Sequence, residues 1–221
     1  GANMKRIIFG TGNTAKLSAM KKCLLPLGIE VVGIYELENI EIPKITETGN
    51  TPLENARQKA TAYYNMLKRP VFSCDDGLYF ENMPDEIQPG VHVRTINGKY
   101  LSDDEMIEYY SSLAEKYGDI TAQYRRGICV VIDENTVYES MDISLAGEKF
   151  IITPKPHKKR NKGFPLDSLS TDIKTGKYFV DIETSENAVT YDGFPEFFSN
   201  IKERITTPNS SLLTPNFNST L

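Results

Sequence analysis

The apolar positions in the first part of the chain change their spacing from segment to segment, and this spacing predicts alternating strands and helices. Residues 6–9 form a short apolar run that predicts a buried strand. Apolar residues then recur at helical spacing over residues 17–24, and Pro26 and Gly28 are expected to end that helix. Residues 30–34 predict a second strand.

The most sharply defined helix start in the chain lies at Thr51. Thr51 is an N-cap residue, Pro52 fits the first helical position, and Glu54 at N3 completes a capping box. The apolar face of this helix consists of Leu53, Ala56, Ala60, Tyr64 and Leu67. Asn55 and Lys59 flank that face, so both are expected at its rim. Glu54 is expected to act as a cap, whereas Lys59 is either a solvated side chain or a phosphate contact.

Carboxylates stand before and after this helix. Glu47 lies in the glycine-containing turn that precedes it, and a short apolar strand at residues 71–73 is expected to stop on Asp75 and Asp76. The two ends of such a unit can meet at one edge of a sheet, where paired carboxylates suit a hard cation such as magnesium. Taken without Glu47 and the helix, residues 75–77 are explained more simply as an acidic turn after a strand.

The turn at residues 10–16 joins the first strand to the first helix and reads Gly-Thr-Gly-Asn-Thr-Ala-Lys. The free N–H groups and positive dipole end of a helix suit an anion, and Lys16 in the first turn can reach a phosphate. The segment lacks the spacing of a Walker P-loop. Capping of the helix by Asn13 or Thr14, with Lys16 solvated, explains the same residues equally well.

The middle of the chain predicts one more helix and an antiparallel region. Residues 102–105 form a second capping box, and the helix that follows is expected to end at Gly118. Its apolar face consists of Met106, Tyr110, Leu113 and Tyr117. Residues 120–152 predict two or three long antiparallel strands. His92 is expected to be a surface or packing residue.

The remainder of the chain contains one dense basic run, at residues 154–162, which is expected to be a solvated loop. A loop over a phosphate site is the second interpretation. A nucleic-acid patch is the third, because aromatic residues do not interleave with the basic ones. A short amphipathic helix is expected to bury Phe194, Phe197, Phe198 and Ile201. Residues 206–221 are expected to form a polar tail.

Composition agrees with an ordinary globular protein. The chain has 221 residues, 39% hydrophobic and 25% charged, and a net charge of -5 that argues against a nucleic-acid partner. Its 3 cysteines lack a CxxC pair, which argues against a disulfide framework or zinc site and favours a reducing compartment. No apolar run is long enough to span a bilayer, so we expect a cytoplasmic protein without a membrane partner. We expect residues 4–205 to form one domain and residues 1–3 to be a cloning remnant.

Four motifs, in this order, resemble the inosine triphosphate pyrophosphatase family. They are TGN-x-x-K at residues 11–16, ETG-x-T-x-x-ENA-x-x-KA at 47–60, DxGL at 75–78 and Pro-Gly-Val at 89–91. The resemblance implies an α/β fold with an elongated central mixed β-sheet, flanking helices and two lobes around a nucleotide cleft, usually in a homodimer. It implies hydrolysis of non-standard purine nucleoside triphosphates such as ITP, dITP and XTP to the monophosphate and pyrophosphate. The implied cofactor is Mg²⁺, with Mn²⁺ as an alternative.

The same resemblance implies roles for individual residues. It assigns the metal to Glu47 and Asp75, which are then the two catalytic carboxylates, with Asp75 as the base that activates water. It assigns triphosphate binding to Thr11, Gly12, Asn13, Lys16 and Lys59. Asp76 stands where the family has a small residue, and we expect it beside the substrate.

The resemblance also implies contacts with the nucleoside. Residues 163–167 are similar to the family's GFGYD segment, which contacts the base and sugar. Phe164 is therefore expected to stack on a purine, and Asp167 to accept a hydrogen bond from it. A core phenylalanine and a loop aspartate explain this pair equally well.

The largest departure from the family lies at residues 185–192. The family's EKN-x-x-SHR segment supplies a lysine, a histidine and an arginine to the base pocket, and here Glu186, Tyr191 and Asp192 stand in those positions. Two cations have become carboxylates. A keto oxygen at purine C6 needs a hydrogen-bond donor, whereas an acceptor-rich pocket favours an amino group. The sequence therefore leaves the preferred base open.

Together these features predict a magnesium-dependent nucleoside triphosphate pyrophosphatase with divergent base recognition. One alternative is a pyrophosphatase that acts on an ordinary or modified nucleotide. The other is a nucleotide-binding sensor that has lost turnover. Retention of both Glu47 and Asp75 argues against the sensor, because a binding module has no need of a base that activates water.

Overall fold

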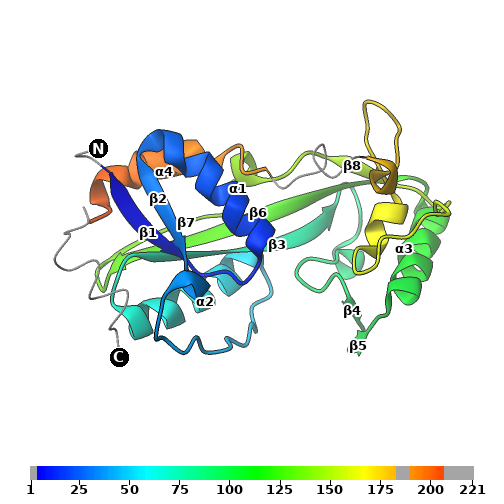
Figure 1. The fold of residues 1–221 in the computed structure, drawn as a ribbon. Helices are drawn as coiled ribbons and strands as arrows, with labels where there is room; N and C mark the ends of the chain where they lie inside the picture. The colour runs from blue at the N-terminus through cyan, green and yellow to red at the C-terminus, as the bar shows by residue number, and fades with distance from the viewer. Residues whose placement is uncertain (1–3, 183–189, 207–221) are drawn as a thin grey trace. The chain divides into compact units, whose positions relative to one another are not determined.

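A computed structural model describes residues 4–182 and 190–206 (Figure 1). The chain groups into two compact units. Unit 1 comprises residues 1–76, 126–146 and 189–221, and unit 2 comprises residues 77–125 and 147–188. Strands β3 and β6 each run from one unit into the other, so the grouping does not divide the sequence into two independent segments.

A mixed seven-stranded sheet forms the centre of the fold, in the order β2-β1-β3-β6-β8-β9, with β7 paired to β6. Its strands are β1 (Lys5–Phe9), β2 (Ile29–Gly33), β3 (Val71–Phe80), β6 (Ile120–Asp133), β7 (Thr136–Ser140), β8 (Phe150–Ile152) and β9 (Ser170–Thr171). Strand β1 is parallel to β2 and β3, whereas β6–β7, β6–β8 and β8–β9 are antiparallel pairs. Strands β4 (Thr95–Ile96) and β5 (Lys99–Tyr100) form a separate two-stranded sheet. The predicted mixed central sheet is confirmed.

Helices cover both faces of the sheet in unit 1 (Figure 1). Helices α1 (Thr14–Leu24) and α4 (Phe194–Ile201) pack on one face, and α2 (Pro52–Leu67) packs on the other. The alternation of side chains along a strand explains both layers. In β1, Ile7 and Phe9 join the core beneath α1 and α4, whereas Ile8 joins the core beneath α2. Nearly continuous apolar strands are typical of parallel sheets buried on both faces.

The core of unit 2 lies between helix α3 (Asp103–Tyr117), strand β8 and the short turn of helix at Pro165–Ser168. Ser102 and Glu105 make the predicted capping box, and Gly118 ends α3 with a φ of 83°. Met106 and Tyr110 are buried as predicted. The prediction for Tyr117 is wrong: its side chain is 40% exposed, because the last turn of α3 extends beyond the core.

Strand β3 is longer than its apolar pattern indicates. The expected strand stops at Ser73, but β3 continues through Asp75 and Asp76 to Phe80. The acidic turn considered for residues 75–77 is therefore wrong. Polar side chains do not end a strand when partners are available, and both aspartates have hydrogen-bond partners. The continuation places two carboxylates within the sheet rather than after it.

The helix that starts at Thr51 is confirmed, with one change in its capping. The Thr51 hydroxyl accepts a hydrogen bond from the Glu54 N–H at 3.1 Å. The Glu54 carboxylate accepts from the Asn50 N–H at 2.6 Å. Glu54 thus satisfies a donor one residue before the expected one, and its role as a cap stands. In the part of the chain that the structure describes, no helix has the length and apolar character needed to cross a bilayer.

Candidate functional site

The turn between β1 and α1 is held tightly at both ends. The Gly10 N–H donates to the Phe72 carbonyl at 2.8 Å, and its carbonyl accepts from the Ser73 hydroxyl at 3.1 Å. A Cβ at Gly10 would lie 2.4 Å from the Tyr63 ring, so a larger residue does not fit at this position. The Asn13 side chain caps α1 by accepting from the Lys16 N–H at 3.0 Å. The capping interpretation of Asn13 is therefore confirmed, and the turn places the start of α1 beside β3.

Lys16 is not simply solvated. Its ammonium group donates to Asp76 Oδ2 at 3.0 Å, so the predicted phosphate contact and the acid on β3 face each other. Burial by itself lowers the pKa of Lys16, but the charge and hydrogen bond of Asp76, together with the charge of Asp75, outweigh it, and the pKa is raised. The ammonium group therefore stays charged, and in this structure its anionic partner is Asp76.

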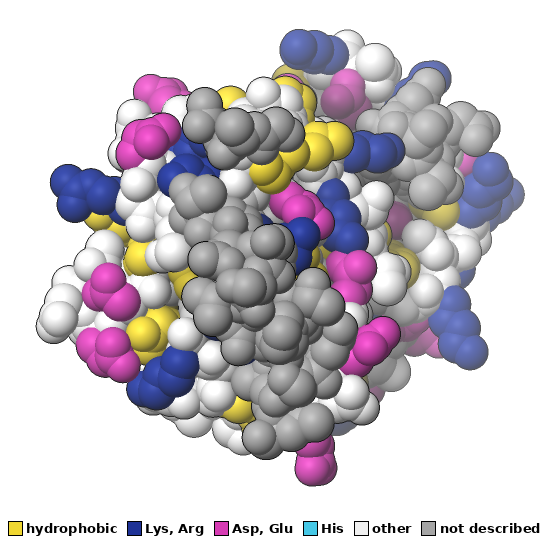
Figure 2. Space-filling view, turned by 60° about the vertical axis from the view of Figure 1, so that its left-hand side comes forward, with side chains coloured by type: hydrophobic (Ala, Val, Ile, Leu, Met, Phe, Trp, Pro, Cys, Tyr) yellow, Lys and Arg dark blue, Asp and Glu magenta, His cyan; other side chains and the backbone are white. Residues whose placement is uncertain are grey.

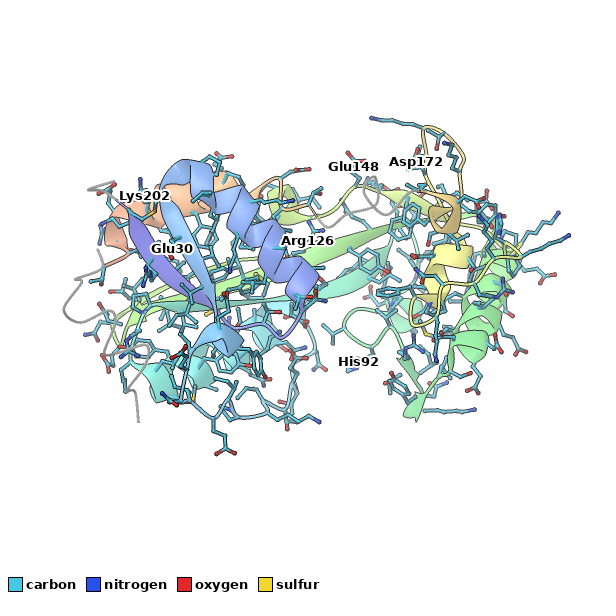
Figure 3. The ribbon with its side chains drawn as sticks, viewed as in Figure 1. Glu30, His92, Arg126, Glu148, Asp172 and Lys202 are labelled. Atoms are coloured by element: carbon cyan, nitrogen blue, oxygen red, sulfur yellow. The ribbon has the colours of Figure 1, made fainter. Side chains whose placement is uncertain are left out.

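A second cation reaches Asp76 from strand β6. Arg126 Nε lies 3.7 Å from Asp76 Oδ1, and Nη1 donates to the Leu145 carbonyl at 3.3 Å. The guanidinium lies over the Tyr191 ring at 5.3 Å from its centroid. Figure 3 labels Arg126 beside the first turn of α1. Sequence reasoning missed this residue, although two consecutive arginines directly before Gly127 and the apolar run that follows it are a usable signal.

Lys59, on α2, links the turn that precedes this helix to strand β3. Its ammonium group lies 2.9 Å from Glu47 Oε1 and donates to the Cys74 carbonyl at 2.7 Å. The Lys59 side chain is only 19% exposed, which argues against the solvated interpretation. Glu47 and the acidic part of β3 were predicted to lie close together. Lys59 joins them, because it contacts both Glu47 and the Cys74 carbonyl.

Asn55 is buried rather than placed at a rim. It is 3% exposed, its Nδ2 donates to Asp75 Oδ2 at 3.0 Å, and its Oδ1 accepts from the Gly49 N–H at 2.8 Å. This corrects the expectation from the helical wheel. One amide thus fixes both the Glu47-containing turn and the Asp75 carboxylate.

Burial raises the pKa of Asp75, and the negative charge of Glu47 raises it further. The Asn55 hydrogen bond and the charge of Lys59 act in the opposite direction but do not cancel the effect. A carboxylate with a raised pKa is a stronger proton acceptor than an ordinary aspartate, which suits a general base as long as it remains ionised. The geometry thus gives Asp75 an orienting partner and a basic character.

The carboxylate oxygens in this cluster suit a cation whose other ligands are water molecules and substrate phosphates. No group of three or more histidine, cysteine, aspartate or glutamate side chains that could hold a metal occurs within residues 4–182 and 190–206. Two carboxylates, Glu47 and Asp75, interact electrostatically, and a bound cation would relieve their repulsion. Mg²⁺ binds through one or two carboxylates while keeping waters and substrate phosphates as its other ligands. The residues present therefore fit Mg²⁺, but not a zinc-type site.

A separate feature lies within unit 2. Phe164 and Asp167 line the same cavity of about 220 Å³, as expected for a shared site. Phe164 is 64% exposed, so the core interpretation of this residue is wrong. Burial raises the pKa of Asp167. The hydrogen bond from Asn161 Nδ2 at 3.0 Å lowers it, but by less, so the pKa stays above its usual value. An exposed aromatic ring and a carboxylate on one cavity can accept a flat heterocycle.

Of the three residues that replace the family's base-pocket cations, Tyr191 and Asp192 lie within the described residues. Tyr191 is 5% exposed and packs edge to face against Phe194 at 4.9 Å, which gives its ring a packing role. Asp192 is exposed. Glu186 lies outside the described residues. The predicted contacts of these three residues with a base stay predictions.

The basic run does not form an isolated positive patch. Lys159 Nζ lies 3.2 Å from Asp181 Oδ1, and His157 Nε2 lies 2.8 Å from Asp181 Oδ2. Figure 2 shows a different face of the molecule, where Lys and Arg side chains are interspersed with Asp and Glu side chains among the coloured atoms. His92 is exposed, as expected. These observations fit a solvated loop.

Comparison with known proteins adds an independent line of evidence. The model of the Ham1 family matches residues 7–185. A dITP/XTP pyrophosphatase of Treponema denticola is 29% identical over 192 residues, which cover 85% of this chain and 93% of that protein. A dITP/XTP pyrophosphatase of Staphylococcus aureus strain MW2 is 30% identical over 191 residues, covering 86% and 78% of the two chains.

Solved structures agree with the fold. A HAM1 protein from Coxiella burnetii has a TM-score of 0.69 and 23% identity, covering 90% of this chain and 100% of that one. The Staphylococcus aureus Ham1 protein has a TM-score of 0.65 and 22% identity, with the same coverage. At these identities the structural likeness bears on the fold alone.

Proposed function

The chain belongs to the Ham1 family, and from this premise we propose that it is a nucleoside triphosphate pyrophosphatase that removes non-standard purine nucleotides such as ITP, dITP and XTP. It hydrolyses the anhydride bond between the α and β phosphates, giving the monophosphate and pyrophosphate. The observation that carries the proposal is the cluster of Lys16, Lys59, Glu47 and Asp75 in unit 1. It combines charges for a polyphosphate with carboxylates for water activation.

The cations bind the triphosphate. Lys16 exchanges its contact with Asp76 for a phosphate oxygen, and Lys59 lies between Glu47 and the β3 backbone, where a second phosphate can reach it. Thr11, Gly12 and Asn13 form the turn that leads into α1, and the N–H groups of the first helical turn add to the positive potential.

Asp75 is the base. Its carboxylate, oriented by Asn55, accepts the proton of the attacking water while the water oxygen bonds to phosphorus and pyrophosphate leaves. Glu47 and Asp75 would hold Mg²⁺, with Mn²⁺ as an alternative, and the bound ion supplies neutralisation of the charge on the leaving pyrophosphate. Asp76, where the family has a small residue, would adjoin the substrate through its contact with Lys16.

The cavity with Phe164 and Asp167 is the proposed base site, with the ring of Phe164 stacking on the purine. A homodimer and a cytoplasmic location, expected from the family resemblance and the composition, belong to the same proposal. A second candidate function is a pyrophosphatase with changed base specificity. The carboxylates at Glu186 and Asp192, in place of a lysine and an arginine, favour it.

The proposal is tested by measuring pyrophosphate release with Mg²⁺ over a panel of ITP, dITP, XTP, ATP, GTP, CTP and dCTP. Release from the inosine and xanthine nucleotides well above the others supports the house-cleaning activity. Preferred cleavage of ATP, CTP or dCTP supports changed specificity. Tight binding without turnover on any triphosphate would instead indicate a nucleotide sensor and overturn the proposal.

A further inference from the structure

The cavity in unit 2 has one cation in its wall among the described residues. Its apolar and aromatic walls come from Val93, Met106, Tyr124, Phe164, Pro165 and Leu166. Two charged side chains, Arg94 and Asp167, line it as well. At about 220 Å³ it is smaller than the clefts of roughly 300–1,000 Å³ that take whole drug-sized ligands. It therefore suits one flat part of a ligand, such as a nucleobase.

Arg94 is held in a fixed position at this cavity. Its Nη1 donates to the Leu101 carbonyl at 3.0 Å and to Asp103 Oδ1 at 2.9 Å, and Nη2 donates to the Gly163 carbonyl at 3.5 Å. The guanidinium also lies 5.6 Å from the centroid of the Tyr100 ring. Asp103 accepts from the Gly163 N–H at 2.8 Å, so the same carboxylate fixes the arginine and the loop that carries Phe164.

A guanidinium and a carboxylate on one cavity are complementary to one class of base. A 6-oxopurine presents the acceptors O6 and N7 side by side and a donor at N1–H, whereas adenine presents an amino donor at position 6 and an acceptor at N1. Arginine has only donors, in a planar fork that matches O6 and N7, and an ionised aspartate has only acceptors. The same pair would place donor against donor and acceptor against acceptor with adenine.

We propose that Arg94 is the specificity-determining residue for the base, donating to O6 and N7 of a 6-oxopurine, while Asp167 accepts from N1–H. The inference rests on the proposed function. It resolves the difficulty raised by Glu186 and Asp192, since the keto oxygen receives its donor from the segment before α3 rather than from residues 185–192. Under it, inosine, xanthine and guanine nucleotides are preferred to adenine nucleotides.

The test compares ITP with ATP in two assays on the full chain. One measures kcat/KM for pyrophosphate release, and the other measures Kd by isothermal titration calorimetry with Ca²⁺ in place of Mg²⁺, so that binding is read even if turnover is absent. Arg94→Met keeps an unbranched apolar side chain in place of the aliphatic part of arginine and removes its donors. We expect the preference for ITP over ATP to fall by a factor on the order of 10 to 100 in both assays. Arg94→Lys keeps the charge without the fork and should retain part of the preference.

Two control variants separate recognition from structure. Lys149→Met removes a positive charge from the same unit, where Lys149 Nζ contacts Glu81 Oε1 at 2.8 Å, and it does not line the cavity. It should leave the preference within about twofold of the original chain. Asp103→Asn weakens the hold on the loop while keeping the guanidinium, so it should weaken both nucleotides in similar proportion. If Arg94 only held the loop, Arg94→Met would behave like Asp103→Asn.

Each outcome decides the inference. A loss of preference in Arg94→Met, with Lys149→Met unchanged, supports it in either assay. An unchanged ratio in Arg94→Met, or original protein that binds ITP and ATP equally, overturns it. Selective ITP binding that depends on Arg94, without turnover, would leave this inference standing while the proposed pyrophosphatase activity fails.

Discussion

The ammonium group of Lys16 lies 3.0 Å from Asp76 Oδ2, although the first is a predicted phosphate ligand and the second stands where the family has a small residue. Arg126 Nε approaches the other oxygen of the same carboxylate at 3.7 Å. Asp76 therefore contacts two cations, one of which, Lys16, is a proposed phosphate ligand. If a phosphate binds at Lys16, as proposed, it competes with this carboxylate for the ammonium group.

Replacing Asp76 by serine should tighten triphosphate binding. The carboxylate competes with phosphate for Lys16 and repels the substrate's negative charge, so its removal should lower KM for the preferred triphosphate by roughly 3- to 10-fold. The measurement is KM at saturating Mg²⁺, at low and at moderate salt, because the effect should shrink as salt screens it. A raised KM, or a new demand for Mg²⁺ in Asp76→Ser, would instead assign Asp76 to the metal.

Asn55 should matter for both stability and turnover. Asn55→Leu leaves the Gly49 N–H and the buried side of Asp75 without their partner, which costs about 1–3 kcal/mol for each buried polar group left unsatisfied. We expect a lower Tm and a kcat reduced by at least tenfold, because Asp75 loses its orientation. Gln58→Leu on the same helix, where Gln58 contacts the more exposed Thr48, is the matched control and should have a smaller effect on both quantities. Equal effects of the two variants would contradict the role assigned to Asn55.

Ionised Asp75 should lower the free energy of unfolding at neutral pH, because its pKa is raised in the folded chain. Its pKa is raised in the folded chain, so its ionisation is harder there than in the unfolded chain. The contribution of Asp75 to stability is therefore full below the unfolded pKa, near about 4, and is lost as the pH rises through the folded pKa. Asp75→Asn should accordingly be more stable than the original chain at pH 7, and this advantage should disappear towards pH 4.

The size of this effect is limited by solvent, because Asp75 is not completely buried. A gain in Tm of about 2–4 °C corresponds to ~1 kcal/mol in a chain of this length. Thermal unfolding in EDTA from pH 4 to pH 8 measures it. Adding Mg²⁺ should then raise the Tm of the original chain more than that of Asp75→Asn. If Asp75→Asn were less stable than the original chain at pH 7 in EDTA, the pKa of Asp75 would have to be lowered by folding rather than raised.

The helix starts at the candidate site are predictable because local rules determine them. The residues Thr51, Pro52 and Glu54 specify where α2 begins, and Asn13 specifies the start of α1. These starts place Lys59 and Lys16 at positions that the structure brings beside β3. Local capping chemistry does not depend on the rest of the fold, which is why the starts of these two helices were predicted correctly.

The parts that were missed depend on contacts between distant segments. The helical wheel locates Asn55 beside the apolar face but cannot show that Asp75 and Gly49 would meet it there and bury it. The continuation of β3 through Asp75 and Asp76 could not be predicted from the local pattern, because the hydrogen-bond partners of these acids lie on other elements. Arg126 reaches Asp76 across neighbouring strands β3 and β6, a pairing that no short-range pattern contains.

The central claim is that Asp75 activates water to split a nucleoside triphosphate between its α and β phosphates. Its most direct test is phosphorus NMR of the products from ITP and Mg²⁺, comparing the original chain with Asp75→Asn. The account predicts one signal for the monophosphate and one for pyrophosphate, with a rate at least 100-fold lower in the variant, on the scale of losing a general base. Formation of a nucleoside diphosphate and orthophosphate, or an equal rate in Asp75→Asn, would contradict it.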